Sequence, residues 1–319
     1  MDISVVVAAR EDDRPPTEAL EVASRADRLG YGELWVGEGP TWDAFALAAA
    51  IGVTTEQAAI TAGPLAVSVR DPATIVRGAA SVAAVCGRPI GVALGTSSVR
   101  VVEGFHGVSR TGAAATLAAS AEAVRARLDG EATAPGGEPV PATGFRRRLD
   151  PPGGRLTVAA FGDRAIAVAA RHADRMLLDL VSPDQVGELR GKLDAAAEWA
   201  GGRRPTLAAW LPAAVDPAPE STTQLLVSIA GYLTVAGYAE MFTAAGFGEA
   251  VRRAGAGADP GEVLAALPPE AAGTVGLVGD AETVRGRLRA YEAAGLDEVA
   301  IVPATAGDLG GERTLTALA

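Results

Sequence analysis

The chemically useful residues of this chain follow the ends of short apolar runs. Glu38 comes directly after one such run, and Trp42 follows it closely. A carboxylate at the end of a strand could accept a hydrogen bond from the ring N–H of a heterocycle, or act as a base in a desolvated site. The alternative is a solvated carboxylate in a loop or at a helix start, and position in the sequence does not separate the two.

Two further segments could bind an anion or a polar ring. The turn at 95–98, GTSS, follows an apolar run and offers hydroxyls and backbone amides, although such turns also occur where nothing binds. The segment FGDR at 161–164 ends another run and begins a helical pattern. There Gly162 permits close backbone approach, the helix N-terminus favours an anion, and Arg164 adds a cation. Asp163 could equally be a helix cap with no ligand.

The sequence lacks the residues expected for a metal site or for nucleophilic catalysis. The two histidines, His106 and His172, have no spaced acidic or histidine partner, so no metal site is predicted and a structural role is the simpler interpretation of both. The single cysteine, Cys86, lies in an apolar helical run and is predicted to be buried. No nucleophile elbow, dinucleotide-binding glycine motif or P-loop is present. This pattern favours a cofactor-dependent enzyme, in which the cofactor carries the chemistry.

Composition narrows the class of partner. The net charge of −11 argues against nucleic acids and anionic membranes, because phosphate binding needs basic patches. No apolar run approaches the ~20 residues of a membrane span, and no basic leader precedes the first apolar run. We therefore predict a cytoplasmic protein with a small-molecule substrate, folded as one domain over residues 1–319.

Alternating apolar runs and amphipathic patterns predict an α/β fold. Several runs are continuously apolar, as expected for strands buried on both faces of a parallel sheet. The predicted strands are 3–9, 33–37, 59–67, 90–94, 156–161, 175–180, 206–211 and 298–302. The predicted helices include 17–29, 71–85, 164–172, 183–200 and 281–294, with Gly30 and Gly295 as C-caps. This order indicates an eightfold β/α (TIM) barrel, and a doubly wound open sheet is the alternative.

Two segments exceed the usual length of a connection. Residues 131–154 are rich in proline and glycine and are predicted to form an insertion loop. Residues 216–273 are predicted to form a helical insertion, with helices over 232–245 and 260–267. Insertions of this size in a barrel shape the substrate pocket.

The chain resembles the bacterial luciferase-like monooxygenase superfamily, and within it the oxidoreductases that use the deazaflavin coenzyme F420. The likeness is carried by ADRLGYGELWVGEG (26–39), ITAGPLAVSVRDPATIVRGAASVA (60–83), IGVALGTSSVRVVEGFHGV (90–108) and TVGLVGDAETVRGRLRAYEAAGLDEVAIVPAT (274–305). It spans nearly the entire chain. The resemblance implies a TIM barrel with the deazaflavin across the barrel mouth, and a homodimer that pairs early helices such as 43–50.

The resemblance also implies a set of cofactor-binding residues. Glu38 takes the place of the family's acidic residue near the ring system. Leu65 and Ala66 fall near the bulge of the third strand, where a non-proline cis peptide often supports the ring, and Pro64–Leu65 is the alternative bond. The remaining matches are Thr96, Ser97 and Ser98 at the pocket wall, and Phe161, Gly162, Val181 and Ser182 at the phosphate, where Arg164 adds its charge.

One departure from the family pattern indicates the direction of reaction. Family members that oxidise alcohols often carry a histidine directly after the acidic residue, and here that position is Gly39. Its absence favours a reductase that passes a hydride from reduced F420 to a C=C, C=N or C=O bond, and another arrangement of the proton transfer is the alternative. The residues to test around that transfer are Glu38, Trp42, Ser98, Glu103 and His106. The alternatives are an FMN-dependent monooxygenase of the same fold and a non-catalytic protein that binds a deazaflavin or flavin.

Overall fold

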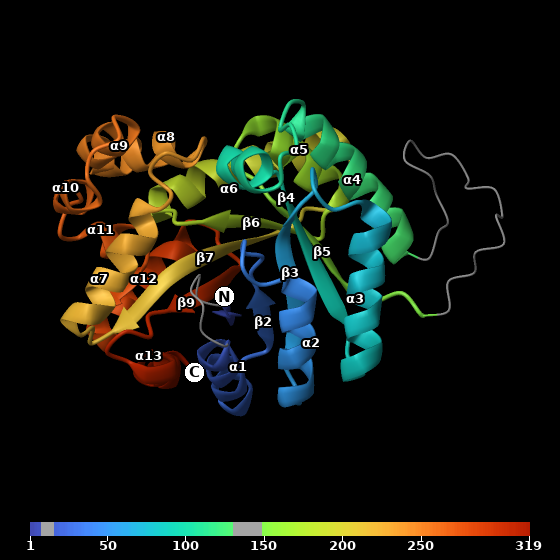
Figure 1. The fold of residues 1–319 in the computed structure, drawn as a ribbon, viewed down its shortest axis with the longest axis horizontal. Helices are drawn as coiled ribbons and strands as arrows, with labels where there is room; N and C mark the ends of the chain where they lie inside the picture. Colours follow the sequence, from blue (N-terminus) through green and yellow to red (C-terminus); the bar gives the residue numbers. More distant parts are fainter. Residues whose placement is uncertain (8–15, 130–148) are drawn as a thin grey trace. The chain divides into compact units, whose positions relative to one another are not determined.

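The computed structural model describes residues 1–7, 16–129 and 149–319 (Figure 1). The predicted insertion loop at 131–154 falls mostly outside the described residues, and its last two residues belong to a strand. Contacts between Cα atoms divide the chain into two compact units. The N-terminal unit comprises Val6–Leu177 and Lys192–Thr206, and the C-terminal unit comprises Met1–Val5, Leu178–Gly191 and Leu207–Ala319. That the whole chain behaves as one domain stays a prediction.

The strands form one parallel sheet that closes into a barrel. Their order is β6-β5-β4-β3-β2-β1-β9-β7-β8, and β6 also pairs with β7, so that β8 is the one strand outside the ring. The strands are β1 (Asp2–Val7), β2 (Glu33–Val36), β3 (Ala59–Ala66), β4 (Ile90–Gly95), β5 (Gly153–Ala159), β6 (Arg175–Asp179), β7 (Thr206–Val215), β8 (Leu277–Gly279) and β9 (Glu298–Pro303). The predicted eightfold β/α barrel is confirmed, and the β6–β7 pairing excludes the open sheet.

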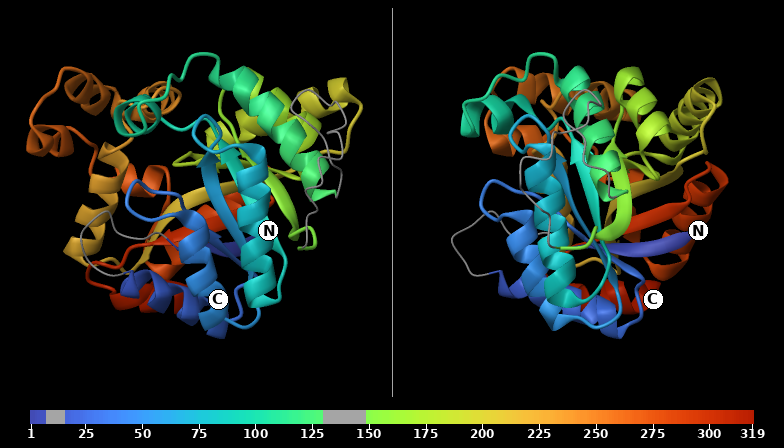
Figure 2. Two further views of the ribbon diagram at one scale, coloured as in Figure 1. Left: turned by 45° about the vertical axis from the view of Figure 1, so that its right-hand side comes forward. Right: turned by 90° about the vertical axis from the view of Figure 1, so that its right-hand side faces the viewer.

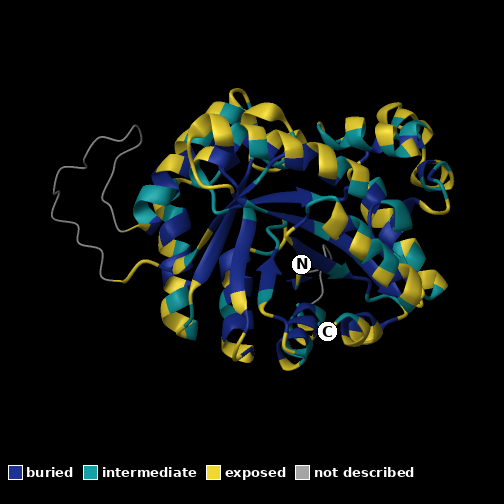
Figure 3. Cartoon of the chain, turned by 180° about the vertical axis from the view of Figure 1, so that it is seen from behind, coloured by how far each residue is buried: buried dark blue, intermediate teal, exposed yellow. Residues whose placement is uncertain are grey.

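Helices in the N-terminal unit alternate with its strands. They are α1 (Thr17–Arg28), α2 (Ala44–Thr54), α3 (Pro72–Cys86), the π-helix η1 (Arg100–Phe105), α4 (Ala113–Leu128) and α5 (Asp163–His172). In this unit α2 packs on α3, α3 on α4 and α4 on α5 (Figure 2). The strands beneath are buried while the outer helix faces are exposed (Figure 3), which explains why β4 is apolar throughout.

Two glycines set the close approach of α2 and α3. A Cβ on Gly52 would lie 2.8 Å from Cβ of Cys86, and a Cβ on Gly78 would lie 2.5 Å from the ring of Phe45. Cys86 itself is only half-buried, so the prediction of a buried cysteine is wrong. The reason is its place at the last turn of α3, where the helix ends at Gly87 in a left-handed conformation.

Helices dominate the C-terminal unit beyond β7. They are α7 (Pro219–Ala230), α8 (Tyr238–Phe242), the π-helix η2 (Thr243–Phe247), α9 (Gly248–Gly255), α10 (Pro260–Ala265), α11 (Ala271–Thr274), α12 (Ala281–Ala293), the 3-10 helix η3 (Leu309–Gly311) and α13 (Glu312–Leu318). The predicted helix at 232–245 is wrong in extent. Gly237 has a φ of 89°, which interrupts a helix at that point, so the helical part of the segment begins at Tyr238 and consists of α8 and η2. One boundary between the two units falls within α6 (Pro183–Ala200).

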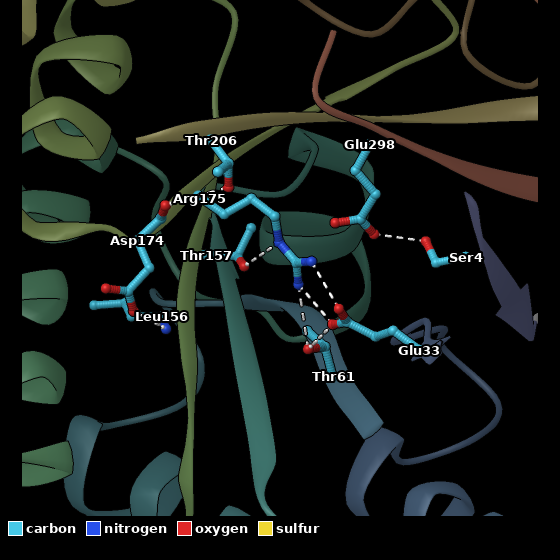
Figure 4. A network of polar contacts seen from close by, with 9 residues as sticks. All are labelled: Ser4, Glu33, Thr61, Leu156, Thr157, Asp174, Arg175, Thr206 and Glu298. Carbon is cyan, nitrogen blue, oxygen red and sulfur yellow. Dashed lines mark hydrogen bonds and ion pairs between the residues drawn. The ribbon is translucent and has the colours of Figure 1, made fainter. Parts of the chain in front are cut away.

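A buried polar network lies at the amino ends of strands in the N-terminal unit (Figure 4). Arg175, the first residue of β6, is fully buried and forms a two-point ion pair with Glu33, the first residue of β2, at 2.7 and 2.8 Å. It also donates to the hydroxyls of Thr157 and Thr61, and its guanidinium lies 3.9 Å from the ring centre of Trp35. The buried charge of Arg175 thus has an ionised partner and further hydrogen bonds, as a buried charge requires.

Candidate functional site

Glu38 lies just beyond β2, in the loop that leads into α2, and both of its carboxylate oxygens are used. Oε1 accepts a hydrogen bond from Nε of Arg70 at 2.6 Å, and Oε2 accepts one from the backbone N–H of Ala44 at 2.9 Å. Arg70 also donates to Asp43. Burial alone would lower the pKa of Arg70, but its two carboxylate partners raise it, so the guanidinium stays charged. Glu38 thus ties the loop after β2 to the turn after β3.

Trp42, in the same loop, carries a donor without an acceptor. The side chain is half-buried, and its indole Nε1 is buried with no hydrogen-bond partner within the described parts of the chain. A buried N–H left without a partner costs about 1–3 kcal/mol, unless a ligand or a water accepts from it. This donor therefore fits a bound molecule with a polar ring.

The end of β3 carries the predicted bulge but not the predicted cis bond. Leu65 and Ala66 are buried, and the register against β4 shifts between Ala62 and Leu65. The one cis peptide bond of the described residues is Gly63–Pro64. The expectation of a non-proline cis bond at Leu65–Ala66, or of a cis bond at Pro64–Leu65, is wrong, because the bond that precedes the proline is the cis one.

The turn after β4 is a strained and hydroxyl-rich segment. Thr96, Ser97 and Ser98 are half-buried, and Ser97 has a φ of 54°, in the left-handed region that favours glycine. Arg110 holds this conformation by donating from Nε to the carbonyl oxygen of Ser97 at 2.8 Å and from Nη2 to Oγ1 of Thr96 at 3.0 Å. Oγ of Ser98 accepts from the N–H of Val101 at 3.3 Å, at the start of η1.

Glu103 and His106 lie on the far side of this loop and are exposed. Oε1 of Glu103 accepts from the backbone N–H of Arg110 at 2.9 Å, so this carboxylate closes the loop on itself. The ring of His106 contacts that of Phe105 edge-on, with ring centres 4.8 Å apart. Their placement assigns them to loop structure, and their role in chemistry stays a prediction.

The segment after β5 offers an open helix start. Gly162 is the N-cap of α5, is exposed, and has no heavy atom within 4 Å of a Cβ placed on it. The N-cap has no side chain to accept from the first N–H groups of α5, and the neighbouring Arg164 is exposed. Asp163 is turned to Lys192 at 2.8 Å. A ten-residue helix with this free end favours a phosphate or another anion.

Val181 and Ser182 belong to the C-terminal unit, where both have internal partners. The carbonyl oxygen of Val181 accepts from the hydroxyl of Tyr291 at 2.7 Å. The N–H of Ser182 donates to Oε1 of Gln185 at 2.9 Å, and its Oγ accepts from the N–H of Gln185 at 3.4 Å. This reciprocal pair is a capping box at the start of α6. The assignment of these two residues to a phosphate stays a prediction.

Sequence analysis missed two arginines, and it placed one acid at a strand end without giving it a role. Arg70 and Arg110 hold the loops after β3 and β4, and no spacing rule signals either, because each acts on a segment distant along the chain. Asp179, the last residue of β6, accepts a hydrogen bond from the hydroxyl of Tyr238. Its position at a strand end was the one available signal, since active sites of barrels collect there.

Left-handed backbone also marks these strand ends. Apart from glycines, the described residues with positive φ are Ser97, Leu180 and Asp216, which follow β4, β6 and β7. Such strain costs roughly 1–3 kcal/mol and is concentrated at functional sites. Over the described ranges, no group of three or more metal-ligating side chains is present. None of the described helices is both long and apolar enough to cross a membrane.

Comparison with known proteins matches the chain to one protein family and to several solved structures. The family model described as luciferase-like monooxygenase matches residues 1–298. A search of curated proteins finds no match. Among solved structures, the coenzyme F420-dependent tetrahydromethanopterin reductase of Methanopyrus kandleri superposes with a TM-score of 0.80 at 15% identity, covering 100% of this chain and 97% of that one.

Two further solved structures with this fold contain different cofactors. An F420-dependent secondary alcohol dehydrogenase, in complex with an F420-acetone adduct, gives a TM-score of 0.75 at 17% identity, covering 100% of this chain and 99% of that one. The oxygenating constituent of 3,6-diketocamphane monooxygenase of Pseudomonas putida, in complex with FMN, gives 0.71 at 14% identity, covering 100% and 96%. At these identities the likeness shows the fold alone.

Proposed function

Because the chain belongs to the luciferase-like monooxygenase family, we propose that it is a coenzyme F420-dependent oxidoreductase that reduces a C=C, C=N or C=O bond of a small organic substrate. The fold that it shares with an F420-dependent reductase and an F420-dependent dehydrogenase supports the choice of cofactor. When bound, reduced F420 supplies the hydride.

Residues of the N-terminal unit fit such a cofactor. The open start of α5 at Gly162, with Arg164 beside it, would hold a phosphate, and the unpartnered Nε1 of Trp42 would donate to a polar ring. The hydroxyl groups of the turn at Thr96–Ser98 would line the pocket, with Arg110 keeping that turn rigid. Rigid walls of this kind contribute to rate by holding donor and acceptor in contact.

The hydrogen bonds of Glu38 support reduction as the direction of the proposed reaction. Oxidation of an alcohol needs a base that takes the hydroxyl proton as the hydride leaves. Here both oxygens of Glu38 are engaged by Arg70 and Ala44, and the next residue is Gly39, which has no side chain. The loop after β2 therefore offers no free base, and reduction of the substrate is the direction that these residues support.

Cofactor titration tests this proposal. The purified protein is titrated separately with F420 and with FMN, and binding is followed by the fluorescence of each cofactor. We expect the Kd for F420 to be lower by about tenfold or more, a difference of ~1.4 kcal/mol. Anaerobic mixing of the reduced deazaflavin complex with a panel of enones, imines and ketones should then regenerate oxidised F420. Binding without transfer to any member of that panel would indicate a non-catalytic deazaflavin-binding protein.

An FMN-dependent monooxygenase is the second candidate. It is favoured by the shared fold with the FMN-bound monooxygenase chain of Pseudomonas putida. Tight binding of FMN, with no binding of F420, would replace the first proposal with this one. Oxygen uptake by the reduced FMN complex in the presence of a ketone would then be the reaction to measure.

A further inference from the structure

The loop between β4 and α4 (Figure 1) carries a half-buried cation, Arg110, whose donors are only partly used. Nε of Arg110 donates to the carbonyl oxygen of Ser97 at 2.8 Å, and Nη2 donates to Oγ1 of Thr96 at 3.0 Å. Its third nitrogen, Nη1, has no acceptor within the described residues. Because a guanidinium donates from all three nitrogens, Nη1 and the second N–H of Nη2 are left for a further acceptor.

Arg110 also lacks a negative partner. No carboxylate of the described ranges lies within ion-pair distance of its guanidinium, and Glu103 accepts from its backbone N–H instead. Other arginines that are at least half-buried in this unit pair with a carboxylate. These are Arg70, Arg125 and Arg175, at 2.6, 2.6 and 2.7 Å. A partly buried cation without such a partner favours the binding of an anion.

Helix dipoles do not supply the missing negative charge. Arg88, where the structure likewise gives no ion pair, donates from Nη2 to the carbonyl oxygen of Gly52 in the last turn of α2. The dipole of a helix is negative at that end, so it compensates the charge of Arg88. Arg110 instead precedes the positive end of α4, where the N-cap Gly112 has no capping side chain. The electrostatics near Arg110 therefore add to its attraction for an anion.

Exposed apolar side chains accompany this cation on the same loop. They are Val99, Phe105 and Val108. Exposed apolar groups that gather on one segment mark a surface that contacts an apolar ligand or partner. An inorganic anion gains nothing from them. An organic acid with an apolar body uses both features, because its carboxylate accepts parallel hydrogen bonds from a guanidinium while its body leaves water.

We propose that Arg110 binds the carboxylate of an apolar organic acid beside the end of β4, and that such an acid, carrying the reducible bond, is the substrate of the proposed reduction. The second part rests on the proposed function, whereas the binding of the acid does not. The unused donors of Arg110 pair with the carboxylate, and Val99 and Phe105 contact the apolar body. The carboxylate is unchanged in the reaction, since hydride supplied by reduced F420 and a proton from water add across the reducible bond.

The first test measures binding of an organic acid without any cofactor. The Nε–H signal of Arg110 is identified in ¹⁵N NMR spectra by its loss in Arg110→Gln. Benzoate should shift this signal with a Kd on the order of 1 mM, whereas benzamide, its neutral analogue, should not. Arg100→Gln, which removes an exposed cation of the same loop, is the matched control and should bind benzoate as the wild type does. An equal shift with benzamide, or no shift with benzoate, would overturn the inference.

A paired comparison separates anion binding from support of the turn. Arg110→Gln also removes the hydrogen bonds that hold Ser97 in its left-handed conformation, whereas glycine adopts that conformation without support. Benzoate affinity is therefore compared between Ser97→Gly and Ser97→Gly/Arg110→Gln, and thermal unfolding checks that both are folded. The second protein should bind benzoate about tenfold or more weakly than the first. Equal affinities would leave Arg110 with a structural role only.

The second test asks whether such an acid is the substrate. With reduced F420 bound, the protein receives benzoylacrylate or its methyl ester, which carry the same reducible bond and differ in charge. We expect kcat/KM of the wild type to be about tenfold or more higher for the acid. Ser97→Gly should keep this preference and Ser97→Gly/Arg110→Gln should lose it, with the same Kd for F420 in both variants.

The outcomes separate the two proposals. A protein that does not bind F420 overturns the proposed function and the assignment of its substrate, while the benzoate titration still decides whether Arg110 binds an acid. Equal kcat/KM for the acid and the ester overturns the substrate class alone. A loss of F420 affinity in Ser97→Gly/Arg110→Gln relative to Ser97→Gly also overturns it, because the negative group bound by Arg110 would then belong to the cofactor.

Discussion

Arg175 and Glu33 are 142 residues apart in the chain, yet their side chains form a two-point ion pair in the core of the N-terminal unit. Burial opposes ionisation of Glu33, but the hydrogen bonds and charge of Arg175 lower the pKa of that carboxyl below its usual value. The pair therefore stays ionised at neutral pH. The pair lies at the amino ends of its strands. In β/α barrels, residues at this end contribute to stability, whereas catalytic residues lie at the carboxyl ends.

Removing one partner of this pair should destabilise the protein strongly. Arg175→Met leaves the Glu33 carboxylate buried without its cation, and we expect a loss of about 3–5 kcal/mol in the free energy of unfolding. Urea titration at pH 7 measures it. Asp194→Asn breaks the exposed pair with Arg204 and should cost no more than about 1 kcal/mol. Equal losses in the two variants would contradict this assignment.

Asp27 should make stability depend on acid pH. Its buried carboxylate accepts hydrogen bonds from three successive backbone N–H groups, those of Glu56, Gln57 and Ala58, at 2.7, 3.0 and 2.8 Å. Burial raises the pKa of Asp27, but these bonds lower it further, to below its usual value. Because the folded pKa is the lower one, the stabilisation is complete above the unfolded pKa and is lost as pH falls through the folded pKa.

Asp27→Asn should therefore cost about 1.5–3 kcal/mol at pH 7, and this cost should shrink as pH falls through the folded pKa of Asp27. Urea unfolding at pH 7 and at a series of successively more acidic pH values gives the comparison. Glu21→Gln, an exposed change on the same helix, should move stability by a few tenths of a kcal/mol at either pH. A constant difference between Asp27→Asn and the wild type across pH would contradict the role of the charge.

Two substitutions at the start of α5 separate the effect of a negative charge on cofactor binding from the effect of helix capping. Aspartate and asparagine are equally good N-caps, so Gly162→Asp and Gly162→Asn should both keep or slightly raise stability. Only the aspartate places a negative charge at the proposed phosphate position. We expect Gly162→Asp to weaken F420 binding by about tenfold or more relative to Gly162→Asn, measured by cofactor fluorescence. Equal F420 affinities of the two variants would mean that the phosphate does not bind at the start of α5.

Ser97 and Ser98 should respond oppositely to replacement by glycine. Ser97 has a left-handed φ of 54°, so Ser97→Gly removes strain and should raise stability by about 0.5–1 kcal/mol. Ser98→Gly loses the acceptor for the Val101 N–H and should lower stability by about 1 kcal/mol. Thermal unfolding of the two variants decides this. A loss in both would mean that the Ser97 hydroxyl, not its backbone, matters.

Continuous apolar runs were enough to predict the barrel. Each of the eight predicted strands is present. Residues 8 and 9 of the first one lie outside the described residues, and other ends differ by a few residues: β5 begins at Gly153 instead of 156, and β7 continues to Val215 instead of 211. The strand β8 was missed because three residues, LVG, carry no periodicity. The helix predicted at 232–245 begins only at Tyr238, because the positive φ of Gly237 is a property of the folded chain that no local pattern shows.

The candidate site was predictable in position but not in its contacts. Strand ends follow from the pattern of runs, which is why Glu38 and Gly162 were found. The partners were not predictable, because Arg70 reaches Glu38 from 32 residues away and Arg110 reaches Ser97 from 13 residues away. Such pairings depend on the register of neighbouring strands and on the path of loops, which no local spacing encodes.

The Arg175 network and the strand-end loops lie at opposite ends of the strands of the sheet. Ser97 and Gly162 lie beyond the carboxyl ends of β4 and β5, whereas Arg175 and Glu33 begin β6 and β2. We therefore expect substitutions in the loops to leave the buried ion pair intact. Proteins of this fold can therefore change ligand through single substitutions in the loops, because the buried residues that stabilise the barrel do not have to change as well.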